Sequence, residues 1–285
     1  MDKKYSTKVG RGKNRFRKGE NGNESRMEID KSTNGVRIRV RAFNEYDKNG
    51  GTVRIFGDGE MKVSEFEAKA EGDIGLPYKL YYNQPTDLIN GEGKDFMIIL
   101  NTSMPYPNWY DNDKDKKKAG MSFAHFLAIP RKPLFNTVTL KKEHASLLRR
   151  MKETLLEKLK DPNFKQRVIY QVFYNIFDFP DNKKTAITPE QFHQFKSDAK
   201  TFMQTDYKKI DEMQFFLHVA YINNNGKLDG DQSIPQLHLH CLENNLRTSD
   251  IHDWKSMPLE SVLNYLDSLS KGDSSNKRTY KKKTI

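Results

Sequence analysis

The stretch SIPQLHLHCLEN, residues 233–244, places two of the chain's seven histidines, His238 and His240, in a short apolar run that follows a glycine-containing loop. Side chains of an extended strand alternate between its two faces. Gln236, His238 and His240 would therefore point one way, and Cys241 and the leucines next to the histidines would point the other. The apolar face has the character of a core and the polar face that of a site. The two histidines could equally occupy a solvated sheet face, or a core in which their ring nitrogens are satisfied.

Composition narrows the class of protein. The 285 residues are 35% hydrophobic and 31% charged, enough for one large domain, or for a domain with an appendage. We find no apolar run long enough to span a membrane, and the first residues lack the apolar stretch of a signal peptide. A single cysteine rules out an internal disulfide. These features predict an intracellular protein, cytoplasmic or nuclear, without a membrane partner.

Positive charge is concentrated at the two ends of the chain. The net charge is +11 and the isoelectric point is near 9.4. Residues 1–34 and 271–285 are polar and basic without hydrophobic periodicity, so we predict disordered tails. Such tails could bind nucleic-acid phosphates, or could serve only solubility.

The segment GVRIRVRAF, residues 35–43, alternates apolar residues with Arg37, Arg39 and Arg41. This alternation predicts a strand with one arginine face, followed by KNGG and then TVRIFG as the turn and second strand of a hairpin. We therefore expect a β-hairpin extension over residues 35–75. Its arginine face could contact a phosphate backbone, although a solvated outer face is an equal alternative.

Residues 76–270 have the pattern of a compact α+β domain, interrupted by a helical insertion at about 160–212. His144 belongs to an apolar helical stripe and His218 alternates with apolar residues in a strand, so both are interpreted as structural. His193 and His252 have no partners by spacing. The predicted strands are 95–100, 121–130, 213–221 and 234–242, with the last two paired as an antiparallel hairpin, and the predicted helices are 141–160, 164–177 and 188–203.

Three ordered blocks resemble the histidine-triad (HIT) superfamily of nucleotide hydrolases and transferases. QLHLHCL matches the HxHxHxx signature with Gln236 in place of the first histidine, and GDQSIPQLHLH resembles the phosphate-contacting loop before it. AHFLAIPRKP resembles the earlier strand that carries a further histidine, His125. The resemblance covers about residues 76–250 and implies a HIT-like antiparallel sheet with flanking helices.

The resemblance also implies a mechanism. His238, at the middle position, would attack the α-phosphorus of a nucleotide and form a nucleotidyl-histidine, which water then hydrolyses. His240 and His125 would orient His238 and help to move protons. Gln232 and Ser233 would hold phosphate oxygens, and among residues 223–225 we select Asn223 and Asn225 as further substrate-binding candidates. No cofactor is implied.

Gln236 and the long insertion depart from the family pattern. An amide can hydrogen-bond but cannot titrate near neutrality, so Gln236 serves if the first position only orients its neighbours and fails if it must carry a proton. Family members often pair as dimers by extending the sheet, and a homodimer is an option here. A metal site is not expected, because no CxxC or HExxH accompanies the histidines and Cys241 points away from them.

Three functions follow from this reading. The first is a HIT-type nucleotidyl hydrolase or transferase acting on a phosphoanhydride, a phosphoramidate or a nucleotidyl adduct. The second is a nucleic-acid-processing version that removes a cap or an adenylate, with the polymer held by the basic tails and the arginine face. The third is a non-catalytic binding module for nucleotides or nucleic acid, for which Gln236 is the main argument.

Overall fold

The structure is a computed structural model. It describes residues 30–55, 59–65, 87–90, 95–110, 119–131, 134–177, 187–207, 212–222, 226, 228–229, 236–248 and 255–269. The predicted tail at 271–285 and residues 1–29 of the predicted N-terminal tail lie outside them. Within the described ranges, no helix has the length and apolar character needed to cross a bilayer.

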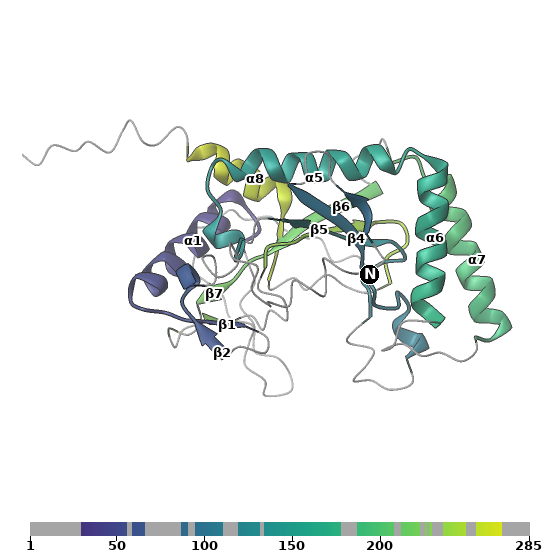
Figure 1. The fold of residues 1–285 in the computed structure, drawn as a ribbon, viewed down its shortest axis with the longest axis horizontal. Coiled ribbons are helices and arrows are strands. Elements are labelled where there is room, and N and C mark those ends of the chain that lie inside the picture. Colours follow the sequence, from purple (N-terminus) through teal and green to yellow (C-terminus); the bar gives the residue numbers. More distant parts are fainter. Residues whose placement is uncertain are drawn as a thin grey trace, which may run out of the picture.

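Helices and strands alternate irregularly along the chain, as in an α+β protein (Figure 1). The helices are α1 (Thr33–Lys48), α5 (His144–Lys158), α6 (Pro162–Phe177), α7 (Pro189–Gln204) and α8 (Leu259–Ser268), with 3-10 turns η1 (Pro107–Trp109) and η2 (Thr137–Thr139). The strands are β1 (Val53–Ile55), β2 (Gly59–Met61), β3 (Asp87–Asn90), β4 (Phe96–Leu100), β5 (His125–Pro130), β6 (Met213–His218), β7 (Tyr221–Ile222), β8 (Leu228–Asp229), β9 (Leu239–Glu243) and β10 (Ser256–Pro258).

The main sheet has six strands in the order β10-β6-β9-β5-β4-β3, and every neighbouring pair is antiparallel. This arrangement confirms the predicted α+β class with an antiparallel sheet. The predicted pairing of the strand at 213–221 with the strand at 234–242 is also confirmed, with Phe216 opposite His240. The residues of β9 therefore lie between two neighbouring strands in the middle of the sheet.

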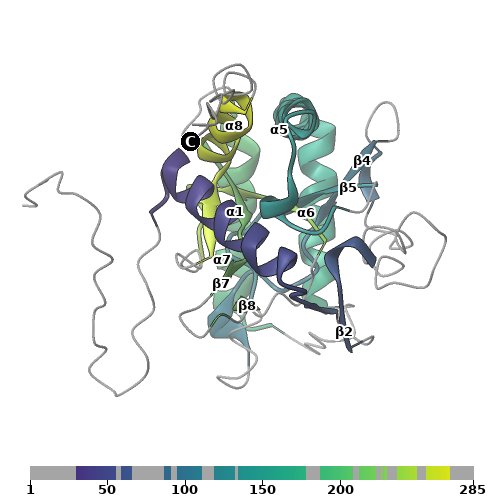
Figure 2. The ribbon, with the colours of Figure 1, turned by 90° about the vertical axis from the view of Figure 1, so that its left-hand side faces the viewer.

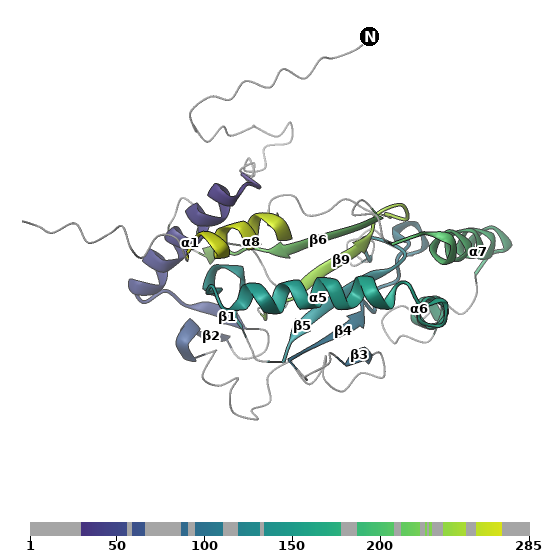
Figure 3. The same cartoon turned by 90° about the horizontal axis from the view of Figure 1, so that it is seen from above.

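Helices cover one face of this sheet. Seen from above, α5 and α8 lie over the strands (Figure 3). Alternate strand residues such as Phe126 and Leu239 join the large apolar core beneath the helices, together with the predicted stripe of α5. The other alternate residues, among them Leu127 and Phe216, form small separate apolar clusters on the opposite face. Sheet alternation thus divides each strand into a helix-packed side and a second side, which carries the histidines.

The insertion forms two helices, α6 and α7, next to each other at one end of the sheet (Figure 1). The predicted capping box at the start of α7 is present, because the Thr188 side chain accepts from the Gln191 backbone N–H and the Gln191 side chain accepts from the Thr188 backbone N–H. Rings of Phe126 and Phe164 stack at 6.3 Å between centroids, which packs α6 onto β5.

The predicted arginine strand at 35–43 is wrong, because these residues lie in helix α1. Val36, Val40 and Phe43 are buried at helical spacing, and Phe43 stacks on Phe135 with 5.7 Å between ring centroids. The Ser32 side chain accepts hydrogen bonds from the backbone N–H groups at the start of the helix. A period of two and a period of 3.6 both fit this apolar pattern, and tertiary burial decides for the helix.

The N-terminal extension therefore consists of a helix followed by a short hairpin. A hairpin does form, but between β1 and β2, and α1 packs against α8 as part of the main core (Figure 2). The predicted boundary at residue 35 falls inside the helix. Arg37 and Arg41 are exposed one turn apart, whereas Arg39 is partly buried. The three arginines therefore do not form one face, which removes the arginine-lined strand as a support for polymer binding.

The helical assignment predicts different costs for two apolar residues that a strand would place on one face. Val36 is 0% exposed and Ile38 is 57% exposed. We expect Val36→Ala to lower the free energy of unfolding by about 1–3 kcal/mol. Ile38→Ala should change it by less than about 0.5 kcal/mol. Urea denaturation of both variants measures the difference, and similar losses at the two positions would contradict the helix.

Candidate functional site

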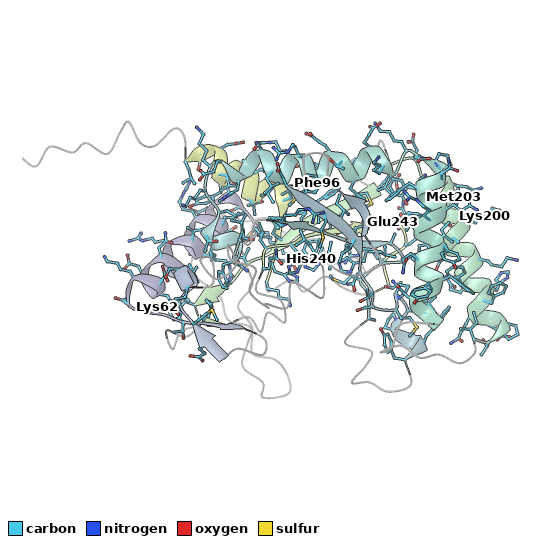
Figure 4. All side chains as sticks on the ribbon, viewed as in Figure 1. Lys62, Phe96, Lys200, Met203, His240 and Glu243 are labelled. Carbon is cyan, nitrogen blue, oxygen red and sulfur yellow. The ribbon has the colours of Figure 1, made fainter. Side chains whose placement is uncertain are left out.

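The two histidines of the opening stretch lie side by side on the sheet face opposite the helices. Their ring centroids are 4.6 Å apart. The His240 ring lies flat on Phe216 of β6, at 4.7 Å between centroids and an interplanar angle of 4°. This stacking fixes the plane of the His240 ring, and the shared face confirms the orientation expected from strand alternation. His240 is labelled within the sheet layer in Figure 4.

His125, predicted from an earlier strand, reaches the same place. It opens β5, which is hydrogen-bonded to β9, and its Nε2 lies 3.0 Å from Nδ1 of His240. Both rings are buried, with 3% and 5% of their surface exposed. The structure therefore brings together the three histidines that the sequence assigned to one site.

The hydrogen bonds around Asn101 determine where the protons of these rings lie. Oδ1 of Asn101 accepts from the Ser103 backbone N–H at 3.0 Å, so the amide NH₂ faces His125 and donates to its Nδ1 at 2.9 Å. A neutral His125 must then carry its proton on Nε2 and donate to Nδ1 of His240. It follows that a neutral His240 carries its own proton on Nε2, an atom that is buried and has no hydrogen-bond partner among the described residues.

His238 has the opposite tautomer. Its Nδ1 lies 2.7 Å from the backbone carbonyl oxygen of Gln236, which can only accept, so Nδ1 carries the proton. The lone pair of a neutral His238 is therefore on Nε2. The two adjacent rings offer complementary groups: His238 presents a nucleophilic nitrogen and His240 presents an N–H donor.

Electrostatics keep all three rings neutral. The pKa of His125 is lowered from 6.5 to about 3, mainly by burial and then by the nearby His238. Burial also lowers the pKa of His238, although the bond to the Gln236 carbonyl opposes this shift. The pKa of His240 lies well below its usual value because of burial and then because of neighbouring histidines and Lys255. Neutral imidazoles are the form in which a ring nitrogen can attack.

Gln236, which stands where the HIT signature has its first histidine, is buried, and its Nε2 donates to the carbonyl oxygen of Pro130 at 2.9 Å. The amide thus ties the segment before β9 to the end of β5. A hydrogen-bond donor is all that this position supplies to Pro130, so the inability of an amide to titrate does not disturb this contact.

His218, which the sequence indicates to be a buried structural residue, lies next to the site histidines. His218 is partly exposed, and its ring centroid lies 4.2 Å from that of His240 and 5.9 Å from that of His238. The antiparallel register of β6 and β9 explains this position, because Phe216 opposite His240 places His218 two residues further along the same face. The sequence contained a signal for this position, because Phe216 and His218 are two residues apart in a predicted strand and so share one face, as His238 and His240 do.

The ligand atoms of His218, His238 and His240 lie within 4.8 Å of one another, close enough to raise metal binding again. A metal ligand needs a lone pair on the coordinating nitrogen. The bonds from Asn101 through His125 place a proton on Nε2 of His240, so metal binding there would require this chain of bonds to rearrange. The arrangement fits a nucleophile beside a donor better than a three-histidine metal centre.

Five of the remaining residues from the sequence analysis lie outside the described residues: Gln232, Ser233, Asn223, Asn225 and His252.

The other cysteine and histidine residues have structural positions. Cys241 is fully buried on the opposite face, as predicted, and burial raises the pKa of its thiol. His144 accepts from the Lys141 backbone N–H at the start of α5, which agrees with its structural assignment, and His193 is exposed on α7. Sequence reasoning missed Asn101 and Lys255, for which no motif gave a signal.

Comparison of the chain with protein-family models, with curated proteins and with solved structures gives no match. The residues of the site therefore have to support any functional conclusion.

The neutral histidines predict how stability depends on pH. Unfolded His125 takes up a proton below about pH 6.5, whereas the folded protein keeps it neutral down to about pH 3. The free energy of unfolding should therefore decrease as the pH is lowered through this window, by up to about 1.4 kcal/mol per pH unit for each such histidine. His125→Gln should reduce this slope, as measured by urea unfolding at about pH 7.5, 6 and 5.

Two features make this measurement specific. Burial raises the pKa of Glu243 to about 7 from 4.5, and this carboxyl acts in the opposite direction between those values, but it is common to both proteins. His193→Gln, at an exposed position on α7, is the matched control and should keep the slope of the unmodified protein. Equal slopes for His125→Gln and this control would show that His125 is not held neutral.

The bond to Pro130 gives a prediction for Gln236. Gln236→Leu leaves a buried carbonyl without its donor and should lower the free energy of unfolding by about 1–3 kcal/mol. Gln236→His keeps an N–H donor and should retain both stability and any activity. Urea denaturation compares the two variants. A Leu variant as stable as the unmodified protein would mean that the Pro130 contact contributes nothing.

Proposed function

We propose that the chain is a HIT-type nucleotidyl hydrolase or transferase that acts through a nucleotidyl-histidine on His238. The observation that supports this most directly is the 2.7 Å contact between Nδ1 of His238 and the Gln236 carbonyl oxygen. It leaves the Nε2 lone pair for bonding, and it keeps a carbonyl dipole next to the ring as positive charge develops. A ring held this way is prepared for attack on phosphorus.

In the first step, the Nε2 lone pair of His238 forms a bond to the α-phosphorus of the substrate. The bond from phosphorus to the leaving group breaks, and the leaving group departs with the electron pair. The His238 ring then carries a positive charge, which the Nδ1–H bond to the Gln236 carbonyl stabilises. A depressed pKa supports this step because it maintains the neutral nucleophile at pH 7.

His240 supplies the complementary interaction. Its Nε2–H can donate to an oxygen on phosphorus as negative charge builds up, without giving up its proton. His125 and Asn101 hold this tautomer through bonds of 3.0 Å and 2.9 Å, and stacking on Phe216 fixes the ring plane. Preorganised donors of this kind cost no reorganisation at the moment of reaction.

In the second step, a water oxygen attacks the same phosphorus. The bond from phosphorus to Nε2 breaks, its electron pair returns to His238, and the proton lost by the water passes to solvent. The products are a nucleoside monophosphate and the neutral enzyme. An alcohol or phosphate acceptor in place of water would make the same protein a transferase.

The amide of Gln236 is compatible with this mechanism. Neither step takes a proton from the Gln236 side chain, whose donor group is already bonded to Pro130. The part of residue 236 that acts on His238 is its backbone carbonyl, which any residue supplies. At residue 236, the backbone carbonyl therefore contacts His238, and the side chain contacts Pro130.

The covalent intermediate can be tested directly. We expect α-labelled nucleotide substrate to leave label on the protein, stable to base and lost in acid, after rapid quenching without acid. The substrates to screen are phosphoramidates, dinucleoside polyphosphates, capped RNA and adenylated DNA. His238→Ala should abolish labelling, and His240→Ala should slow it about 100- to 1,000-fold, the range for losing one preorganised hydrogen-bond donor to a developing negative charge.

The exposed His193→Ala variant should label normally and serves as the control. Equal labelling of His238→Ala would exclude His238 as the nucleophile. Turnover confined to capped RNA or adenylated DNA, with strong salt dependence, would favour the polymer-processing function. Nucleotide affinity without turnover would favour the binding module.

A further inference from the structure

The proposed reaction involves two protons that its three histidines are not placed to carry. A leaving amine takes up a proton in the first step, and the attacking water loses one in the second. Both ring nitrogens of His125 are occupied, by Asn101 and by His240. Nδ1 of His240 is occupied by His125, and Nδ1 of His238 is held by the Gln236 carbonyl oxygen. A further acid-base group is therefore needed at the site.

His218 of β6 is a fourth ring in contact with these histidines. Its ring centroid lies 4.2 Å from that of His240 and 5.9 Å from that of His238. One ring nitrogen of each of the three residues lies within 4.8 Å of the other two. Nitrogens at this separation can contact the same phosphoryl group, directly or through one water. His218 is therefore within reach of a phosphorus bonded to His238.

The fold fixes the backbone of His218 without burying the residue completely. Thr137 of η2 donates from Oγ1 to the His218 carbonyl oxygen at 2.8 Å, and Ser256 of β10 is paired directly opposite. His218 is partly exposed, whereas His125 and His240 are only 3% and 5% exposed. Imidazole is the side-chain group that changes its charge between pH 5 and 8 when it is unperturbed. The position is therefore suited to a group that both gives and takes protons.

A charge on His218 agrees with the proton pattern of the other rings. After burial, His218 is the next cause of the low pKa of His240. A protonated His218 therefore helps to keep His240 neutral. The two rings can act in different roles, because His218 can release its proton while His240 only donates a hydrogen bond.

We propose that His218 is a catalytic acid-base group that serves both steps. This inference rests on the proposed function and adds to it the residue that moves the protons. In an in-line displacement, the nucleophile and the leaving group lie on opposite sides of phosphorus. The first leaving group and the later water therefore occupy the same side, away from His238. One group at that side can protonate the first and deprotonate the second.

The protons balance over the two steps. In the first step, the bond from phosphorus to the leaving atom breaks, and this atom keeps the electron pair and takes the proton of His218. In the second step, the neutral His218 takes a proton from water as the water oxygen bonds to phosphorus, which replaces direct loss of that proton to solvent. The bond from phosphorus to Nε2 of His238 breaks, and His218 is protonated again.

Two substrates with the same nucleotide and different leaving groups test this role. The para-nitrophenyl ester of adenosine monophosphate loses a stable anion that needs no proton, whereas adenosine phosphoramidate loses a nitrogen that must be protonated. With the ester, His218→Ala should form the labelled intermediate within about threefold of the normal rate and lose it about 100- to 10,000-fold more slowly. With the phosphoramidate, formation should slow by a similar factor. Rapid quenching without acid measures both rates.

Three further measurements make the result specific to proton transfer. His218→Gln keeps a hydrogen-bonding side chain that does not titrate near neutrality, so it should behave as His218→Ala does. Imidazole in solution should restore the loss of label from His218→Ala, since it can act as the missing base. The exposed His193→Ala variant should form and lose label normally with both substrates.

Failure of this inference can be distinguished from failure of the proposed function. Loss of label from His218→Ala at the normal rate would overturn the role of His218 and leave His238 as the nucleophile. Equally slow formation with both substrates would also overturn it, because His218 would then only position the site. Absence of label on the unmodified protein with every substrate would instead reject the proposed function, and the acid-base role with it.

Discussion

The hydrogen bond between Nε2 of His125 and Nδ1 of His240, at 3.0 Å, is the contact on which the rest of the site depends. It joins the two strands β5 and β9. Because Asn101 donates to Nδ1 of His125, this bond also determines that the proton of a neutral His240 is on Nε2. Because each imidazole has two nitrogens and one proton when neutral, fixing one nitrogen determines the other. The donor character of His240 is thus set by the amide of Asn101 on a different segment, with the His125 ring between them.

Burial of His125 and His240 supports this arrangement. The helix-covered face holds the large core, while the opposite face surrounds the histidines with buried side chains such as Phe216 and Leu242. Burial of imidazoles favours their neutral forms, since a charge in such surroundings is expensive. Burial therefore favours the neutral rings, and the hydrogen bonds determine which nitrogen of each ring carries the proton.

The helical insertion is part of the same network. Asn175 of α6 is buried and donates to the backbone carbonyl of Asn101 at 3.2 Å, and it also accepts from Gln171 one turn earlier. Lys165 of the same helix donates to the carbonyls of Met203 and Thr205, which ties α6 to the end of α7. The insertion therefore supports the segment that orients His125.

The sequence by itself determined the elements whose pattern is local and unambiguous. The stripe of α5, the capping box of Thr188, the strand at 96–100 and the shared face of His238 and His240 all follow from side-chain periodicity. Residues 36–40 fit a strand and a helix equally well, and only packing against the core selected the helix. Likewise, the pairing of β10 with β6 brings Ser256 to His218, and the register of β5 with β9 brings His125 to His240. These contacts join residues far apart in the chain, and no local propensity specifies them, because register and strand order arise from the burial of one sheet face as a whole.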